Sequence, residues 1–534
     1  MVHFIDDYLE KQQELTAVEK FAFQHDFRQL PEQERLYTDL IPKNTPGPGQ
    51  QYAFEVNLDQ CSGCKACVTA CHNENGLDED ETWRSVGLLQ GGTSQEPVIQ
   101  HITTACHHCL DPACLNGCPV NAYEKSLTTG VVKHLEDQCI GCQYCTFTCA
   151  YNVPKYSKKK GIVHKCDMCI SRLEVGQAPA CVRACPNGAI RIKLIDTAAV
   201  RNNPTEFVKT PEAPDSHYTL PTTRYIHKKE FPANMASADF YSVKTEHSHL
   251  PLVVMLVLTQ LSVGAFAVLL FLSNQILLMI PYHMLVALSV GVLALAASVL
   301  HLGRPLYAFR AVLGLKKSWL SREIVAFGVF AVSAACYIFS HGVGLALVTL
   351  VSGIFGVFCS VQVYRYTKRP FWDNSLTILK FFFTTGILGI TTILWSTIIF
   401  SKIYPQGVSS LMQDISKILW AVLVGMSALK LTLESTIFIS LKDHQLSSLK
   451  KTALLMTSVL KDATLWRFIC GIAGGIVLPV LLLIIYPTPQ VLNTLFLATG
   501  ILVLSLAGEF LERYLFFKAV VPLQMPGTGP HHEE

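Results

Sequence analysis

Charged residues are scarce in this 534-residue chain, since Asp, Glu, Lys and Arg together make up 16% of it. A typical soluble protein has about 25%. The shortage is concentrated after residue 250, and a half that lies in a membrane is the simplest reason for it. The formal net charge is only +3, and no basic stripe with interleaved aromatic residues is present, so we set nucleic-acid binding aside.

The chain also opens without an export signal. Residues 1–7 (MVHFIDD) contain no basic stretch followed by an apolar one, and no twin-arginine pair precedes an apolar run. We therefore expect a chain that carries no export signal of its own.

Cysteine, in contrast, is concentrated in one stretch. Four groups of four lie between residues 61 and 185: Cys61, Cys64, Cys67 and Cys71; Cys106, Cys109, Cys114 and Cys118; Cys139, Cys142, Cys145 and Cys149; Cys166, Cys169, Cys181 and Cys185. The first and third groups share the spacing C-x2-C-x2-C-x3-C. In bacterial ferredoxins three thiolates of such a run hold one cubane cluster and the fourth reaches another. The four groups therefore predict four [4Fe-4S] clusters.

Zinc is the main alternative, because C-x2-C pairs also build tetrahedral zinc sites. The repeated C-x2-C-x2-C triplet does not suit one tetrahedron, whereas soft thiolates suit the iron of a cluster. Disulfides are disfavoured further, because crowded cysteines usually bind metal unless the chain is a small secreted scaffold.

Changes in composition divide the chain. We predict an N-terminal extension (1–50, helical over 15–27), a cysteine-rich domain (51–199), a proline-rich connector (200–249), a membrane part (250–518) and a C-terminal tail (519–534). The predicted fold class is an α+β ferredoxin-like iron–sulfur domain of two pseudo-repeated modules, followed by an all-α bundle of eight transmembrane helices.

Within the cysteine-rich domain, residues 52–58 and 130–135 alternate like strands that lead into cysteine groups. The acidic run 78–81 is interpreted as a solvated loop rather than a metal site. His107 and His108 fill the gap between two cysteines. We expect them beside a cluster or at the surface, although a histidine ligand stays open.

Eight apolar stretches each approach the ~20 residues that a bilayer helix needs. They cover residues 250–273, 281–301, 322–340, 343–364, 376–400, 414–440, 467–486 and 490–517. Because eight is an even number, both ends of the membrane part lie on the side of the cysteines.

Basic residues are unevenly shared between the loops. Those on the cysteine side are Arg304, Arg310, Lys316, Lys317, Arg322, Arg365, Lys368, Arg369, Lys442, Lys450, Lys451, Lys461, Arg467, Arg513 and Lys518, against little beyond Lys402 and Lys417 opposite. The positive-inside rule then places the cysteine-rich domain in the cytoplasm, on the inner membrane of a bacterium. A basic docking face, or a partner with its own export signal, would give the same bias with that domain in the periplasm.

Two ionisable residues lie at the membrane face on the cysteine side. His301 ends the second stretch in HLGRP (301–305), and Glu323 opens the third in SWLSRE (318–323). A quinol needs a hydrogen-bond partner for each ring oxygen and a route for its protons, which a His and a Glu can supply. A capping histidine and a glutamate paired with Arg322 or Arg304 would explain the same residues, so both interpretations stay open here.

Two pairs at i,i+4 spacing lie deeper in the membrane part, Lys430 with Glu434 and Glu509 with Arg513. Mutual neutralisation is the favoured interpretation and proton conduction the second. Histidine is nearly absent from the apolar stretches, and the last five have none within them. We therefore expect electron transfer without haem b.

Residues 55–195 resemble the four-cluster electron-transfer subunit of the DMSO reductase family of molybdenum enzymes. The resemblance rests on the four cysteine groups, on the Cys-Pro pairs at 118–119 and 185–186, and on CIGCQYC at 139–145. Residues 250–518 resemble the eight-helix membrane anchor of the same enzymes, through HLGRP and SWLSRE. The order of the halves is similar to a fusion of the B and C subunits.

The resemblance implies that three cysteines of one group share a cluster with the fourth of another. The implied sets are Cys61, Cys64 and Cys67 with Cys185; Cys166, Cys169 and Cys181 with Cys71; Cys106, Cys109 and Cys114 with Cys149; Cys139, Cys142 and Cys145 with Cys118. It also implies a menaquinol site at His301 and Glu323, with Arg304 from the same motif.

We therefore expect a conduit without a substrate-reducing site of its own. It would oxidise menaquinol from the membrane pool and pass electrons through four [4Fe-4S] clusters to a separate molybdopterin catalytic subunit in anaerobic respiration. A similar conduit serving nitrate, polysulfide or tetrathionate, with electrons running toward quinone, is the second hypothesis. A module that moves protons through Lys430, Glu434 and Glu509 is the third.

Overall fold

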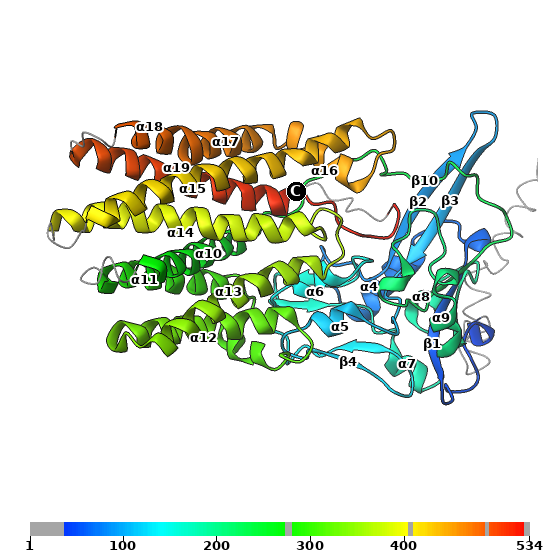
Figure 1. Ribbon diagram of the computed structural model, residues 1–534. Coiled ribbons are helices and arrows are strands. Elements are labelled where there is room, and N and C mark those ends of the chain that lie inside the picture. Colours follow the sequence, from blue (N-terminus) through cyan, green and yellow to red (C-terminus); the bar gives the residue numbers. More distant parts are fainter. Residues whose placement is uncertain (1–36, 273–279, 404–409, 486–490, 528–534) are drawn as a thin grey trace, which may run out of the picture.

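The computed structural model describes residues 37–272, 280–403, 410–485 and 491–527. Small sheets and short helices come first, and long helices that run side by side follow (Figure 1). The predicted fold class, an α+β domain followed by an all-α bundle, is therefore confirmed. The helix predicted over residues 15–27 lies outside the described residues.

Four small sheets organise the cysteine-rich domain. They are β8 (Ile190–Asp196), β1 (Gln50–Asn57) and β9 (Arg224–Ile226); β10 (Ala236–Ser237), β2 (Ser85–Gly92) and β3 (Pro97–Thr104); the hairpin β4 (Tyr123–Lys125) and β5 (Val132–His134); and the hairpin β6 (Lys155–Ser157) and β7 (Ile162–His164). β1 and β5 confirm the two predicted strands. Since β9 and β10 come from residues 200–249, the connector completes two of these sheets.

Short helices follow the cysteine loops. They are α4 (Ala66–Asn75), α5 (Ala113–Gly117), α6 (Tyr144–Thr148), α7 (Ile170–Glu174), α8 (Ala180–Arg183) and α9 (Thr197–Asn202), with single 3-10 turns η1 (Thr38–Leu40), η2 (Leu58–Gln60), η3 (Pro204–Glu206) and η4 (Ser216–Tyr218). The first and third cysteine groups take the same backbone path. Gly63 and Gly141 have φ of 73° and 69°, and Lys65 and Gln143 have φ of 61° and 58°. Left-handed backbone at matching positions shows that the repeated spacing produces a repeated loop.

Eight helical spans form the second part. Their helices are α10 (Leu250–Leu272), α11 (Ile280–Leu300), α12 (Trp319–Ser340), α13 (Val343–Arg365), α14 (Ser375–Ile403), α15 (Ser410–Ser435), α17 (Lys461–Ile472) continued by α18 (Leu478–Ile485), and α19 (Val491–Lys518). Turns η6 (Pro305–Val312) and η8 (Thr436–Lys442) and helix α16 (Ser448–Thr457) lie between them, and a π-helical turn η9 (Ala473–Val477) joins α17 to α18. The eight predicted spans are matched within a few residues, except that the seventh starts at Lys461. Arg467 and Arg513, both counted above among the loop residues, therefore lie inside spans.

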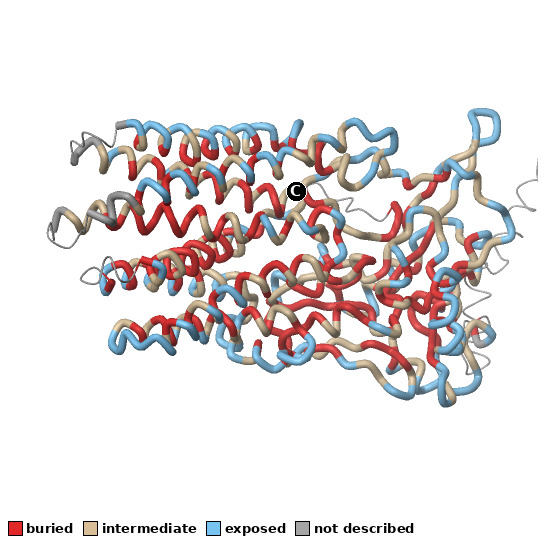
Figure 2. The backbone as a smooth tube through the Cα atoms, viewed as in Figure 1, coloured by how far each residue is buried: buried red, intermediate tan, exposed pale blue. Residues whose placement is uncertain are grey.

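Helices α10 and α14 form the centre of the bundle. In their most apolar windows 72% and 67% of residues are buried, against 28–39% in the other six spans. Exposed residues lie along the outer helices (Figure 2), and many of them are large and apolar, as lipid contact requires. A Cβ on Gly264 would lie 1.9 Å from the carbonyl oxygen of Thr385. Glycine thus lets α10 and α14 touch backbone to backbone.

The C-terminal segment returns to the cysteine-rich domain after α19. Met525 is fully buried in the core of that domain. A Cβ on Gly87 of β2 would lie 2.2 Å from the carbonyl oxygen of Pro526. The two parts are therefore held together at the connector and again at the C-terminal segment.

Candidate iron–sulfur and quinol site

The sixteen cysteines converge in crossed sets. Burial raises the pKa of the Cys61 thiol, and the thiolates beside it, which raise it further, belong to Cys64, Cys67 and Cys185. We call this set centre 1. Centre 2 is Cys166, Cys169 and Cys181 with Cys71. Burial raises the pKa of Cys71 to about 12, and Cys181 and Cys169 are among its neighbours.

The other two sets cross in the same way. Centre 3 is Cys106, Cys109, Cys114 and Cys149, which line one cavity with Lys165 and Tyr151. Centre 4 is Cys118, Cys139, Cys142 and Cys145, and the nearest charges acting on buried Cys145 are those of the other three thiols. From sequence order alone, the four cysteines of each run would be expected to form one centre. Folding instead brings together the sets that the resemblance implies.

These donors suit clusters better than single ions. All cysteines are free thiols. In the described part of the chain no three His, Cys, Asp or Glu side chains converge closely enough to hold one metal ion. A cubane attaches each thiolate to a different iron and so spaces its ligands more widely than zinc does.

Backbone N–H groups also point at the sulfurs, in a pattern repeated between the halves. The N–H of Gly141 and that of Met168 each lie 3.4 Å from the preceding ligand sulfur, two residues back. The N–H of Ala122 and that of Ala189 each lie 3.3 Å from a sulfur four residues back. Such donors stabilise thiolates that carry cluster charge. The residues therefore fit iron–sulfur clusters.

Side chains that lie between the centres show their order. Arg84 acts on thiolates of centres 1 and 2, Lys165 on those of centres 2 and 3, and Tyr123 on those of centres 3 and 4. The centres therefore follow one another in a row. Cys64 of centre 1 is exposed, and centre 4 lies next to the helical part.

The loop between α11 and α12 holds centre 4. Its Arg304 N–H donates to the carbonyl of Ile140 (3.0 Å), and its Gly314 N–H donates to Pro119 (2.7 Å). A Cβ on Gly303 would lie 2.0 Å from the carbonyl oxygen of Gly161. This contact excludes any larger residue and seats the cysteine-rich domain on the membrane face.

His301 connects the membrane face directly to centre 4. Burial lowers the pKa of its imidazole, while the backbone of Cys142 in centre 4 acts on that pKa in the opposite direction, which shows that the two lie next to each other. Its Nε2 is buried and has no hydrogen-bond partner among the described residues. A neutral imidazole with a free nitrogen is thus held beside a predicted cluster ligand.

Glu323 is almost fully buried, on the second turn of α12, and the Ser360 hydroxyl donates to its carboxylate. The alternative ion pairs are not found: Arg322 donates to the carbonyls of Leu315 and Lys316, and Arg304 to that of Glu136 at 2.8 Å. Phe327 and Phe330 follow Glu323 at i+4 and i+7, hence on the same helix face. They line an apolar cavity between α10, α11 and α12.

The structure also locates three histidines and one glutamate that the sequence left open, misplaced or missed. His107 and His108 are buried rather than at the surface, and His107 lines the cavity of centre 3, beside a cluster site as predicted; its ring bonds the Thr223 hydroxyl at 2.8 Å. Glu81, predicted in a solvated loop, is buried and bonds His164 at 2.8 Å. Sequence reasoning missed buried His249, whose ring lies 5.7 Å from that of His301. Its position at the start of the first span was the available signal.

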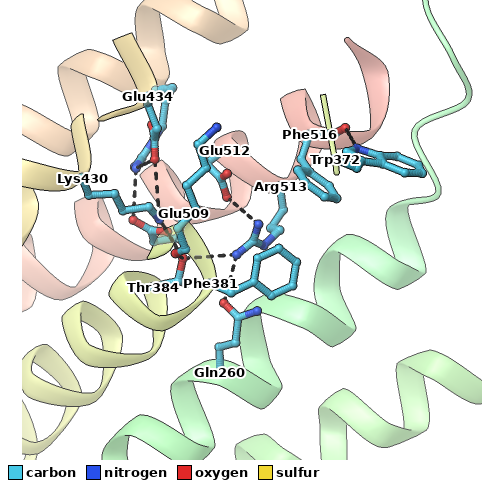
Figure 3. A network of polar contacts seen from close by, with 12 residues as sticks. Gln260, Trp372, Phe381, Thr384, Lys430, Glu434, Glu509, Glu512, Arg513 and Phe516 are labelled. Carbon is cyan, nitrogen blue, oxygen red and sulfur yellow. Dashed lines mark hydrogen bonds and ion pairs between the residues drawn. The ribbon is translucent and has the colours of Figure 1, made fainter. Parts of the chain in front are cut away.

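Figure 3 shows a buried ionic network deeper in the bundle. Lys430 contacts Glu434 at 3.6 Å, which confirms that predicted pair, and it also contacts Glu509. Arg467 bridges the same two glutamates, at 2.8 and 3.2 Å. The predicted pair of Glu509 with Arg513 is wrong. Arg513 instead contacts Glu512 at 3.1 Å, and its guanidinium donates to Gln260 of α10 at 3.2 Å.

Known protein families match the two halves of the chain separately. Residues 98–194 match the 4Fe-4S dicluster domain family, and residues 243–518 match the DMSO reductase anchor subunit (DmsC) family. The B subunit of anaerobic dimethyl sulfoxide reductase from Escherichia coli K12 is 35% identical over 179 residues, which cover 32% of this chain and 86% of the relative.

Proteins of other enzyme systems are also similar to this chain. Hydrogenase-2 operon protein HybA of Escherichia coli O157:H7 is 36% identical over 156 residues, 24% of this chain and 48% of the relative. The iron–sulfur subunit of nitrate-inducible formate dehydrogenase of Escherichia coli K12 is 35% identical over 166 residues, 27% of this chain and 56% of the relative.

Proposed function

Because this protein belongs to the DMSO reductase anchor (DmsC) family and fuses an iron–sulfur domain of the B-subunit type to that anchor, we propose that it is the quinol-oxidising conduit of a molybdenum enzyme. It oxidises menaquinol at the membrane face and delivers electrons through four [4Fe-4S] clusters to a separate molybdopterin subunit of DMSO reductase type. When bound, the clusters supply one-electron carriers.

One observation carries the proposal: the buried imidazole of His301 lies beside the backbone of Cys142 in centre 4. A quinol hydroxyl that donates to the free Nε2 of His301 is thereby one side chain away from a cluster ligand. The imidazole accepts the hydroxyl proton as the electron leaves.

Glu323 supplies the second polar group of the pocket. Its buried carboxylate has one hydroxyl partner, Ser360, and an apolar cavity lies on the same face of α12. Quinone sites combine a few placed polar groups with apolar walls. We assign the quinol ring to the polar end near Glu323, with Phe327 and Phe330 as the apolar wall beside it. The Arg304 guanidinium donates to the carbonyl of Glu136 and so fixes the loop that carries His301. We therefore assign Arg304 the role of positioning His301.

We place the cysteine-rich domain in the cytoplasm. With Arg467 and Arg513 removed from the count, because both lie inside spans, the loops on its side still carry most of the basic residues, as the positive-inside rule requires of a cytoplasmic face. Protease treatment of spheroplasts tests this. Cleavage of the cysteine-rich domain in intact spheroplasts would place it in the periplasm instead.

The test of the quinol site is reduction of the clusters by a menaquinol analogue in the purified full chain, followed by their absorbance. In His301→Ala we expect quinol-driven reduction to fall by about 10²-fold or more, because the proton acceptor is lost. Reduction by dithionite and the cluster EPR signals stay intact. His341→Ala, at the other membrane face, is the matched control. Retained quinol oxidation in His301→Ala would remove His301 from the site.

The second candidate is the same conduit serving another redox partner, with electrons running toward quinone. Similarity to a hydrogenase operon protein and to a formate dehydrogenase subunit favours it. Purifying the chain with its natural partner decides between the two. A partner that reduces DMSO supports the first candidate, and one that oxidises formate or hydrogen supports the second.

A further inference from the structure

Two basic side chains are buried among the cysteines. Arg84 is 2% exposed and Lys165 is 3% exposed. Burying a charged group costs several kcal/mol unless an opposite charge compensates it. Each of these residues therefore needs a partner, and their surroundings show what it is.

Arg84 lies between centres 1 and 2. Its Nη1 donates to the Thr103 hydroxyl at 3.1 Å, and its guanidinium lies 4.7 Å above the ring of Phe54. Its Nη2 is buried and has no hydrogen-bond partner among the described residues. The same Thr103 hydroxyl lies 3.5 Å from the sulfur of Cys67 in centre 1. The charges that act on Arg84 most strongly are thiolates of both centres, with Cys181 first and Cys67 next.

Lys165 occupies the equivalent place between centres 2 and 3. Its ammonium donates to the carbonyl of Cys166 at 2.8 Å and to that of Val132. Lys165 lines one cavity with the cysteines of centre 3. The charges that act on it most strongly are the thiolates of Cys106, Cys114 and Cys166, followed by the Asp167 carboxylate. Centre 4 differs, because the strongest charges on its Cys145 are thiolates and no buried cation is among them.

We propose that Arg84 and Lys165 are the counter-charges of the iron–sulfur chain, so that Arg84 raises the reduction potentials of centres 1 and 2, and Lys165 those of centres 2 and 3. Reducing a centre adds one electron and one negative charge, with no bond made or broken. A buried cation beside the centre stabilises that added charge, because the low dielectric weakens the interaction little. The inference rests on the clusters of the proposed function. It assigns to these two residues the positive charge that the cysteine thiolates do not supply.

The experiment is an EPR-monitored redox titration of the purified full chain with its clusters assembled. Each centre is identified beforehand by the signal lost in one cysteine-to-serine variant. In Arg84→Gln we expect the equilibrium constants for reduction of centres 1 and 2 to fall by about tenfold, which is about 59 mV for one electron. Centre 4 keeps its potential. In Lys165→Gln we expect the equilibrium constants for reduction of centres 2 and 3 to fall instead.

Matched variants separate the effect of the Arg84 charge from that of its side-chain shape. Arg84→Lys keeps the charge and restores the potentials, and Arg201→Gln removes an exposed charge of α9 without effect. Loss of the clusters in Arg84→Gln but not in Arg84→Lys also supports the inference, because charge is what the second variant keeps. Equal shifts at all four centres, no shift, or loss of clusters in both variants overturns it. A wild-type chain without cluster signals would instead reject the proposed function.

Discussion

At the scale of single residues, the charges buried in the membrane part depend on one another. Lys430, Glu434 and Glu509 (Figure 3) form a closed set of contacts with Arg467, and the four residues come from three spans. The two positive and two negative charges cancel, which removes most of the cost of holding them in lipid. Such a set favours a structural clamp between α15, α17 and α19 over a proton route.

Glu509→Gln should therefore destabilise the protein by about 3–5 kcal/mol, because Lys430 and Arg467 keep their charges and lose a shared partner. Thermal unfolding of the full chain in detergent measures the effect. The double variant Glu509→Gln with Lys430→Met is the control and should recover part of the loss, since it restores neutrality. A double variant less stable than the single one would contradict the clamp.

At the scale of elements, the bundle depends on how closely its two central helices approach. Gly264 of α10 and Gly389 of α14 face each other, and a Cβ on Gly389 would lie 2.3 Å from the carbonyl carbon of Gly264. In lipid, helices associate through close packing rather than through exclusion of water. The glycine pair therefore sets the distance between these two spans.

Gly264→Ala should force α10 and α14 apart and destabilise the bundle by about 1–3 kcal/mol, the usual cost of overpacking. Gly328→Ala in α12 is the matched control, because a Cβ there meets no atom within 4 Å. The melting temperatures of the two variants in one detergent give the comparison. Equal melting temperatures would show that the α10–α14 contact does not limit the stability of the bundle.

At the scale of the whole molecule, the two parts meet so that His301 and centre 4 adjoin. Three glycines make this seat possible, since Gly303 of the membrane loop approaches the backbones of Gly141 and Gly161. The buried C-terminal segment around Met525 ties the two parts together at a second place. The position of the electron path therefore follows from contacts between parts far apart in the chain.

Gly303→Val should lift the cysteine-rich domain from its seat and slow quinol-driven cluster reduction by about 10²-fold, as small misplacements of reacting groups do. Reduction by dithionite should be unchanged, because the clusters themselves are not touched. Gly342→Val, where a Cβ meets no atom within 4 Å, controls for the substitution. Unchanged quinol kinetics in Gly303→Val would show that the seat does not limit electron transfer.

Local features of the sequence were sufficient for the general design. Cysteine spacing indicates ligand loops because neighbouring ligands are placed by a few backbone dihedrals, and Gly63 and Gly141 show those dihedrals repeated. Span length indicates membrane helices because bilayer thickness sets it. The same local reasoning found Lys430 with Glu434, which are one helical turn apart.

Only the tertiary structure decided the rest. It paired Glu509 with Lys430 and Arg467 instead of Arg513, buried Glu81 against His164, and placed Arg84 between two sets of thiolates. Each of these contacts joins residues that are distant in the chain. Such contacts leave no periodic trace in a sequence, because their partners are chosen by how whole elements pack and not by the spacing along any one of them.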